Sequence, residues 1–297
     1  MLYSHIQPKV SIIFAIKNEG LNVLTTLESL KVSLTLLPFE VIIVDDQSID
    51  SCCEFLFGYK FPTPIHYVKT AGAGPAEARN IGAARAKGEI LIFCSAYMYF
   101  NDYWMDQLAE PILERRVDCT SPSISLYNAQ GRIGYGQKLI LPEMRTEWIL
   151  ESLDSASAAI MPWECIAVGQ SAYQNAQGFE EGFKEGPAIA AEFSLRMRLL
   201  GFSCSIAPDV NVQLMKRTLF PYIAPEDCSG YHLLRMAYMH FNEERLAKSR
   251  DAISTPEDVH MWETQILEEG VLEQRERYLA SRQFDDTWFF ERYHIYF

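Results

Sequence analysis

The segment at residues 39–50, FEVIIVDDQSID, constrains the fold more than any other part of the chain. Its apolar run shows no polar alternation, which is typical of a strand covered on both faces in a parallel sheet. The run ends in two carboxylates, Asp45 and Asp46, and then in residues that favour a turn. Because ligands of open α/β sheets bind beyond the carboxyl ends of the strands, we expect both carboxylates to face a ligand. The alternative is that Asp46 and Asp50 only cap the next helix.

Strand and helix patterns alternate through the first third of the chain. Leucines at helical spacing predict a helix over residues 20–36, and Ala-rich sequence predicts another over residues 75–87. Pro75 suits the first turn of the second helix, and Gly88 suits its end. Short links between such units predict a right-handed, mostly parallel α/β sheet flanked by helices. The strands are expected at residues 9–16, 39–46, 65–70 and 89–96.

Charge and hydropathy disfavour several classes of partner. A net charge of -13 over 297 residues disfavours nucleic acid and anionic membranes, because both need a basic surface. No apolar run approaches the roughly 18 residues of a membrane span, and the N-terminus lacks the apolar core of a signal peptide. We therefore expect a soluble cytoplasmic protein with no membrane span.

Cysteine and histidine spacing predicts neither disulfides nor a metal site. The seven cysteines are odd in number and scattered beside apolar neighbours, which fits reduced thiols. Adjacent Cys52 and Cys53 are not expected to form a disulfide. The six histidines show no metal-ligand spacing, and His232 and His240 are interpreted as ordinary helix residues.

The glycine-rich segment at residues 71–74 invites a dinucleotide-binding interpretation. Gly72 and Gly74 do not complete the GxGxxG pattern, and the acidic partner about 20 residues further on is missing. A Rossmann dehydrogenase is therefore disfavoured.

Five segments occur in the order found in one known family: VSIIFAIKNEG, EVIIVDDQSIDS, GPAEARNIGAARAKGEILIF, GFEEGF and EFSLRMRLLGF. Together they span most of residues 9–217 and resemble the family 2 glycosyltransferases of the GT-A fold. The resemblance implies a glycosyltransferase-like domain over residues 1–220, with a nucleotide-binding half at about 1–100 and an acceptor half at 101–220. Residues 221–297 would then form a helical C-terminal extension.

The resemblance also implies a nucleotide-sugar donor, with a UDP-sugar favoured. Asp45 and Asp46 would meet the base and ribose, since carboxylates accept hydrogen bonds from base N–H groups and ribose hydroxyls. Arg79 would lie near the nucleotide, where a guanidinium suits phosphate; the alternative is an ion pair across its own helix. The other residues expected to line this pocket are Ala15, Lys17, Asn18, Ser95 and Tyr97.

Three departures from the family concern its metal and its base. Where the family carries Asp-x-Asp for Mg²⁺ or Mn²⁺, this chain reads Phe93, Cys94, Ser95, Ala96, Tyr97 and Met98. Both metal-binding carboxylates are absent, and serine and tyrosine are poor replacements because they are neutral at pH 7. The segment at residues 208–214 has an apolar residue in place of a metal-facing histidine, and residues 188–191 lack the aspartate that acts as general base. A bound Mg²⁺ or Mn²⁺ is therefore doubtful here.

Two functions remain open. In the first, the chain is an inverting, metal-independent sugar transferase in which Lys216 and Arg217 stabilise the diphosphate. Glu185 or Glu192 would then serve as the general base for the acceptor hydroxyl. The alternative for Lys216 and Arg217 is a solvated basic pair, and the alternative for Glu192 is a structural residue.

In the second function, the fold is kept but sugar transfer is lost. The chain would act as a binding or scaffold subunit, or would run different chemistry in the donor cleft. Tyr97 and Tyr99 would help to close the vacated metal site.

The acceptor is unknown and could be a natural product, a peptide, a glycan or a lipid-linked sugar. The least alignable segment, residues 141–177, holds Trp148 and Trp163, which either stack on a sugar or fill the core; we favour the core. A helix is expected over residues 101–116 and a hairpin over residues 127–139.

The C-terminal region is expected to contain two helices, over residues 229–250 and 254–282, with Ser254 and Glu257 as a capping box. The chain ends in TWFFERYHIYF, which would be an unusually apolar surface if it were exposed. We therefore expect this end to dock on the body of the protein or on a second subunit, which would give a homodimer.

Overall fold

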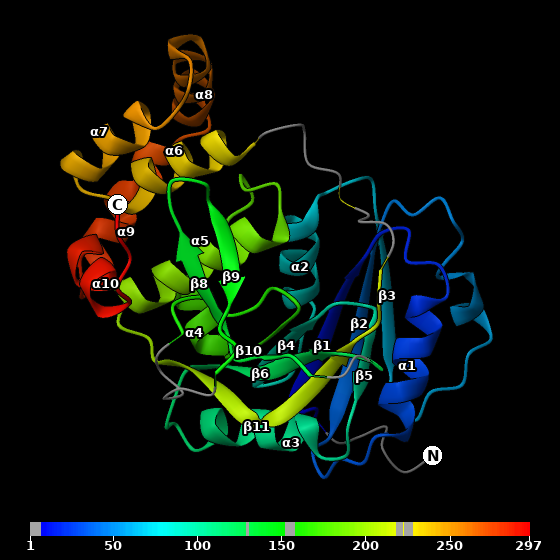
Figure 1. The fold of residues 1–297 in the computed structure, drawn as a ribbon. Coiled ribbons are helices and arrows are strands. Elements are labelled where there is room, and N and C mark those ends of the chain that lie inside the picture. Colours follow the sequence, from blue (N-terminus) through cyan, green and yellow to red (C-terminus); the bar gives the residue numbers. More distant parts are fainter. Residues whose placement is uncertain (1–6, 129–130, 152–157, 218–221, 223–227) are drawn as a thin grey trace.

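A single mixed sheet organises the molecule. The computed structural model describes residues 7–128, 131–151, 158–217, 222 and 228–297. In this part of the chain a nine-stranded sheet has the order β3-β2-β1-β4-β10-β6-β11-β5, with β7 paired to β6 (Figure 1). The strands of this sheet are β1 (Val10–Ile16), β2 (Phe39–Asp46), β3 (Ile65–Thr70), β4 (Ile90–Cys94), β5 (Met98–Phe100), β6 (Cys119–Leu126), β7 (Ile133–Gly134), β10 (Cys165–Gly169) and β11 (Cys204–Leu214).

The strands β3, β2, β1 and β4 are parallel, and their carboxyl ends meet along one edge. Ile16 of β1 lies opposite Asp45 of β2, and Phe14 of β1 lies opposite Cys94 of β4. All eight residues of β2 are buried, which confirms that its apolar run is covered on both faces. Asp46 lies opposite Thr70 at the end of β3, so the acidic end of β2 sits between two neighbouring strand ends.

Beyond β4 the sheet becomes mixed. Strand β10 runs antiparallel to both β4 and β6, β11 runs parallel to β6, and β5 runs antiparallel to β11. The predicted α/β fold is thus confirmed. Antiparallel strands complete the second half of the sheet.

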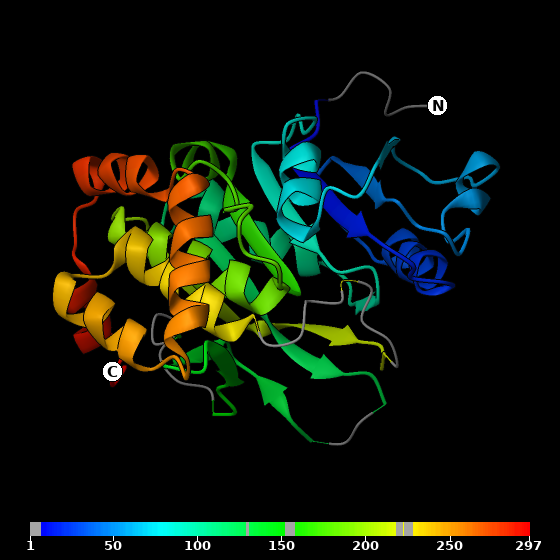
Figure 2. The same cartoon turned by 90° about the horizontal axis from the view of Figure 1, so that it is seen from above.

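Helices cover both faces of the sheet (Figures 1 and 2). Leu27 of α1 and Leu108 of α3 belong to one buried core, whereas Ala78 of α2, Tyr173 of α4 and Phe193 of α5 belong to the core on the opposite face. The helices predicted over residues 20–36, 75–87 and 101–116 form within those ranges. The bounds are α1 (Asn22–Val32), the 3₁₀ helix η1 (Glu54–Phe57), α2 (Pro75–Ala83), α3 (Trp104–Leu113), α4 (Gln170–Asn175) and α5 (Gly186–Leu199).

The predicted hairpin over residues 127–139 forms with a different pairing. β7 pairs with the end of β6, where Ile124 lies opposite Gly134, so the first arm of the hairpin precedes residue 127. A second hairpin, which the sequence did not reveal, joins β8 (Gln137–Ile140) to β9 (Arg145–Trp148). Gly134 packs against Trp148, because a Cβ atom at Gly134 would lie 2.2 Å from the indole ring.

The prediction of two long C-terminal helices is wrong, because each is divided. Phe241 has extended backbone after α6, and the Asn242 side chain then caps α7 by accepting a hydrogen bond from the backbone N–H of Arg245. Gly270 takes a left-handed conformation between α8 and α9, and Thr255 rather than Ser254 caps α8. The helices are α6 (Ser229–His240), α7 (Glu243–Asp251), α8 (Pro256–Glu268), α9 (Val271–Ser281) and α10 (Asp286–Arg292).

The aromatic end of the chain docks on the body of the protein, as predicted. Phe289 and Phe290 are buried, and the Phe290 ring lies 5.2 Å from that of Phe241. The hydroxyl of Tyr293 accepts a hydrogen bond from Arg198 of α5. A homodimer through this end stays a prediction. Among the described residues, no helix combines the length and the apolar character that crossing a membrane requires.

Candidate active site

Hydrogen bonds join the loop that follows β1 to the loop that follows β2. Asn18, which has a left-handed backbone, donates its N–H to the Ser48 hydroxyl at 3.0 Å and accepts the N–H of Ile49 at 2.8 Å. The backbone N–H of Gly20 donates to the Asp50 carboxylate at 2.8 Å. Asn18 and Asp50 therefore shape the rim of the strand edge where Asp45 and Asp46 lie.

Asp46 organises the glycine-rich segment. Its carboxylate is completely buried and accepts hydrogen bonds from the Thr70 hydroxyl and from the backbone N–H groups of Ala73 and Gly74. Gly72 and Gly74 have φ values of 97° and 92°, which only glycine adopts readily, and so the backbone can wrap around the carboxylate. Burial raises the pKa of Asp46, but these hydrogen bonds outweigh it and hold the pKa below its usual range. Asp46 is therefore ionised at neutral pH.

Asp45 is held from two sides. It accepts a hydrogen bond from the Tyr67 hydroxyl at 2.7 Å and one from the backbone N–H of Ser48 at 2.9 Å. A carboxylate has about four acceptor positions, so Asp45 keeps acceptor capacity for a ligand. Ala15, also predicted here, is half-buried in β1 opposite Val44.

Lys17 lies at the end of β1 and faces the same edge. Its Nζ is 5.2 Å from the ring centroid of Tyr222, which follows β11 in the chain. The Lys17 charge helps to lower the pKa of Asp46, and the Asp46 charge, after burial, helps to raise the pKa of Tyr222. The structure therefore brings Lys17, Asp46 and Tyr222 together.

Arg79 of α2 is a buried cation whose guanidinium group contacts a residue outside its own helix. Its side chain donates to the backbone oxygen of Trp163 at 2.8 Å, and the guanidinium carbon lies 3.3 Å from the centroid of the Trp163 ring. Arg79 is 2% exposed, and its Nε and Nη1 atoms find no hydrogen-bond partner among the described residues. Burial lowers the pKa of Arg79 to about 10, which still leaves it charged at neutral pH. A buried cation with unused donors is suited to an anionic ligand.

Tyr97 and Arg217 meet beside this edge. The Arg217 guanidinium carbon lies 4.4 Å from the Tyr97 ring centroid, and Arg217 forms an ion pair of 2.9 Å with the buried Glu19. A backbone hydrogen bond from Met215 to Tyr97 brings the end of β11 to this place. Lys216, its neighbour in the chain, is exposed. The two cations predicted to act together therefore have different surroundings.

The end of β4 is packed with small and apolar side chains. Cys94 and Ala96 are 0% and 2% exposed, and the Cys94 sulfur lies 3.7 Å from that of Cys165. The nearly buried Ser95 donates its N–H to the backbone oxygen of Glu164 at 2.9 Å. Thiol and methyl groups are poor ligands for Mg²⁺ or Mn²⁺, and the neutral hydroxyls of Ser95 and Tyr97 are weaker ligands than the carboxylates that such ions prefer.

Glu164 is a carboxylate near these groups that the sequence reasoning missed. Its Oε2 atom is buried and has no hydrogen-bond partner among the described residues. Burial raises the pKa of Glu164, while the Arg79 charge opposes this rise. The Glu164 charge in turn helps to raise the pKa of Tyr97, after burial. No motif pointed to Glu164, because its position depends on β10 packing antiparallel beside β4.

The two predicted bases lie in different environments. Glu192 is completely buried, forms an ion pair with Arg196 at 2.6 Å and shares a hydrogen bond of 2.9 Å with Nε2 of His240. Burial raises the pKa of Glu192, but Arg196 and His240 outweigh it and bring the pKa to about 2. This carboxylate is a poor proton acceptor without access to a substrate, and its contacts indicate a structural role. Glu185 is half-buried at the start of α5.

Trp163 connects Glu185 to Arg79. A Cβ atom at Gly186 would lie 2.4 Å from the Trp163 ring, so the start of α5 packs directly on the face of this indole. Trp163 is half-buried and its ring stacks against the Arg79 guanidinium, so the predicted core role describes only part of its contacts. Trp148 packs against the core, as expected.

Comparisons with known proteins agree with this architecture. The model of the family "Glycosyl transferase family 2" matches residues 11–174. Polypeptide N-acetylgalactosaminyltransferase 8 of Drosophila melanogaster is 28% identical over 211 residues. The match covers 65% of this chain and 36% of that protein. The chain thus spans about a third of the length of that relative.

Solved structures show the same fold. A crystal structure of GalNAc-T7 with UDP, GalNAc and Mn²⁺ superposes with a TM-score of 0.69 at 16% identity, over 97% of this chain and 57% of the other. S. aureus TarS 1-349 in complex with UDP-GlcNAc gives a TM-score of 0.54 at 20% identity, over 95% of this chain and 75% of the other. Since the family model matches more than half of this chain, the chain belongs to glycosyl transferase family 2.

Proposed function

We propose that the chain transfers a sugar from a nucleotide-diphospho-sugar, with a UDP-sugar favoured, to an acceptor and does so without a metal ion at the end of β4. Membership of the family, together with the UDP and UDP-GlcNAc bound in solved structures of similar fold, supports the donor class. The observation that carries the proposal is Arg79. It places a buried positive charge with two unused donor atoms near the aligned ends of β1, β2 and β4.

The nucleoside would bind along the ends of β1 and β2. Asp45 retains acceptor positions for a base N–H or a ribose hydroxyl. Asp46 holds the glycine-rich segment in place through its three hydrogen bonds, so its role would be to shape the pocket. Asn18 and Lys17 would line the adjoining rim.

Cationic side chains would stabilise the diphosphate. Arg79 would donate from Nε and Nη1, and Arg217 would approach from the end of β11, beside Tyr97. Fixed cations aimed at a leaving group lower the barrier because they need no reorganisation as charge develops. This arrangement would replace the metal of the family. Ser95 and Tyr97 would shape the wall of the phosphate site.

Glu164 becomes our first candidate for the general base. Its carboxyl oxygen is buried and unpartnered, and burial raises its pKa toward the range in which a group both accepts and releases protons. Glu185 is the second candidate, from the start of α5. An inverting displacement would use one of them to take the proton of the acceptor hydroxyl.

Calorimetric titration with nucleotides tests the proposal. UDP, GDP, dTDP and their sugars are titrated into purified protein with Mg²⁺, with Mn²⁺ and with EDTA. We expect one nucleotide class to bind equally well in EDTA and to release its sugar when the acceptor class is supplied. The absence of nucleotide binding under all conditions would refute the donor site, whereas loss of binding in EDTA would refute metal independence.

The alternative is a protein that binds a nucleotide sugar but does not transfer the sugar. The observation that favours it is the burial of Ser95, which is 7% exposed, at a position where the family places a metal-binding carboxylate. The same titration separates the two functions. Tight binding without transfer to any peptide, glycan or lipid-linked acceptor would support the binding role.

A further inference from the structure

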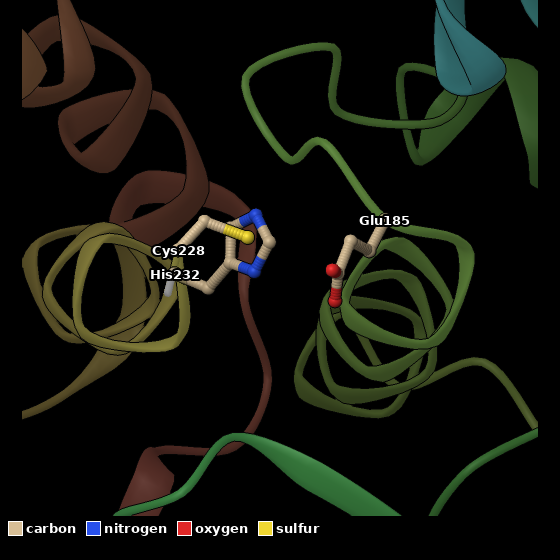
Figure 3. Close-up of side chains that lie close together, drawn as sticks. All are labelled: Glu185, Cys228 and His232. Carbon is tan, nitrogen blue, oxygen red and sulfur yellow. The ribbon is translucent and has the colours of Figure 1, made fainter. Parts of the chain in front are cut away.

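Three potential metal ligands from distant parts of the chain lie close together, and two of them have no role in the candidate active site (Figure 3). They are Glu185, Cys228 and His232, and their ligand atoms all lie within 4.8 Å of one another. Glu185 immediately precedes α5, and Cys228 immediately precedes α6. His232 lies one helical turn after Cys228, so both face the same side of α6. The sequence showed no metal-ligand spacing, because the third ligand comes from another helix.

The orientation of His232 suits a ligand. Its ring is buried, and its Nε2 atom accepts a hydrogen bond from the backbone N–H of Lys184 at 3.1 Å. This nitrogen therefore carries no proton, and its lone pair points toward the loop that holds Glu185. The nearby cation Arg235 is balanced by ion pairs with Glu180 and Glu269. Its charge is therefore largely compensated.

We propose that Glu185, Cys228 and His232 bind a zinc-like divalent ion, with water in the remaining position. A thiolate, an imidazole and a carboxylate form a ligand set typical of Zn²⁺, whereas Mg²⁺ and Mn²⁺ prefer oxygen ligands. In a tetrahedral site with ligand atoms about 2.0–2.3 Å from the ion, those atoms lie about 3.3–3.8 Å apart. The spacing of up to 4.8 Å would close to that range by a movement of about 1 Å of the Glu185 side chain.

Metal binding would exchange one contact for three coordination bonds. The ion would replace the hydrogen bond between the backbone N–H of Lys184 and Nε2 of His232. Glu185 and Cys228 each lie at the N-terminus of a helix, where the helix dipole favours an anionic carboxylate or thiolate.

A bound ion would join the start of α5 to the start of α6. It would fix the C-terminal helices to the second half of the sheet domain. It would also fix one end of the chain segment that connects Arg217, in the candidate active site, to Cys228. A metal-bound Glu185 could not act as a base, which agrees with Glu164 as the first candidate. The inference does not depend on nucleotide binding.

Titration with Zn²⁺ alone and with Co²⁺ alone tests this site in the full chain after treatment with EDTA. We expect one ion per chain and, for Co²⁺, a near-ultraviolet thiolate-to-metal charge-transfer band with the visible bands of four-coordinate cobalt. Mg²⁺ in excess should not displace either ion. Cys228→Ser should abolish the charge-transfer band, and Glu185→Gln should weaken Zn²⁺ binding about tenfold or more.

The matched control is His260→Ala, which removes an exposed histidine of α8 and should change nothing. Circular dichroism verifies that each variant is folded, and Glu185→Gln alters only one half-buried side chain. Failure of the wild-type chain to bind Zn²⁺, or wild-type affinity in both Cys228→Ser and Glu185→Gln, would overturn the proposal. Nucleotide titration in EDTA is measured separately, so the fate of the donor site does not affect this result.

Discussion

Replacement of Arg79 by methionine separates a ligand-binding cation from a structural one. Methionine keeps the apolar part of the side chain on Trp163 but removes the charge and the donors at Nε, Nη1 and Nη2. If Nε and Nη1 each donate to a phosphate oxygen, two charge-assisted hydrogen bonds of about 1.5–3 kcal/mol are lost. The total of about 3–6 kcal/mol corresponds to roughly 10²-fold to 10⁴-fold weaker nucleotide binding.

The free protein should change much less. Arg79→Met removes a cation stacked on Trp163, worth about 0.5–2 kcal/mol, and also relieves the burial of a charge that forms no ion pair with a carboxylate among the described residues. We therefore expect the free energy of unfolding in urea, followed by circular dichroism, to change by less than about 2 kcal/mol.

The assay is calorimetric titration of the favoured nucleotide in EDTA. The matched control is Arg85→Met, which removes an exposed arginine just beyond the end of the same helix and should leave the affinity unchanged. Nucleotide affinity of Arg79→Met within threefold of the wild type would refute the assignment. A large loss of stability in the free protein would instead show that Arg79 is structural.

Three further predictions follow from neighbouring groups. Arg217→Ala should weaken nucleotide binding about tenfold or more, whereas exposed Lys216→Ala should change it less than threefold, both by calorimetry. Glu192→Gln should lower the free energy of unfolding by about 3–5 kcal/mol, since it leaves Arg196 buried without its partner. Because the pKa of Glu192 in the folded protein is about 2, its contribution to stability is present above the ordinary pKa of 4.5 and is lost as the pH falls toward 2. Urea titrations across this pH range would measure the loss. Since burial raises the pKa of Glu164, the transfer rate should fall when the pH is lowered through that raised pKa. Glu164→Gln should remove both the activity and this pH dependence. An unchanged rate in the variant would leave Glu185 as the base.

The sequence was sufficient for the parts of the fold that local patterns determine. The unbroken apolar run of β2 predicted its complete burial, and the acidic end of that strand lies at the edge of aligned strand ends, as expected. The division of the C-terminal helices was missed because Asn242 sits inside an otherwise continuous helical pattern. Its side chain forms an N-cap only because Phe241 turns away to pack on Phe290.

Contacts between distant segments could not be predicted in the same way. Arg79 and Trp163 are brought together by the antiparallel placement of β10 beside β4, which no local pattern encodes. The same pairing of β10 with β4 also brings Glu164 near the candidate active site. His232 and Cys228 were visible as neighbours on one helix, but their meeting with Glu185 depends on how α6 packs near α5.

The balance of charge at the strand edge explains why Arg79 should decide the function. Asp45, Asp46 and Glu164 all bring negative charge to the place where a diphosphate would bind, so binding requires cations that are not already neutralised. Arg217 is partly neutralised by Glu19, with which it forms an ion pair. Arg79 instead lies on an indole ring and donates only to a backbone oxygen among the described residues, so it keeps its charge and two donors for a ligand. In the proposed function, a site built this way would attract a diphosphate through one buried arginine, and the response to Arg79→Met distinguishes a donor site from a closed cleft that binds no nucleotide.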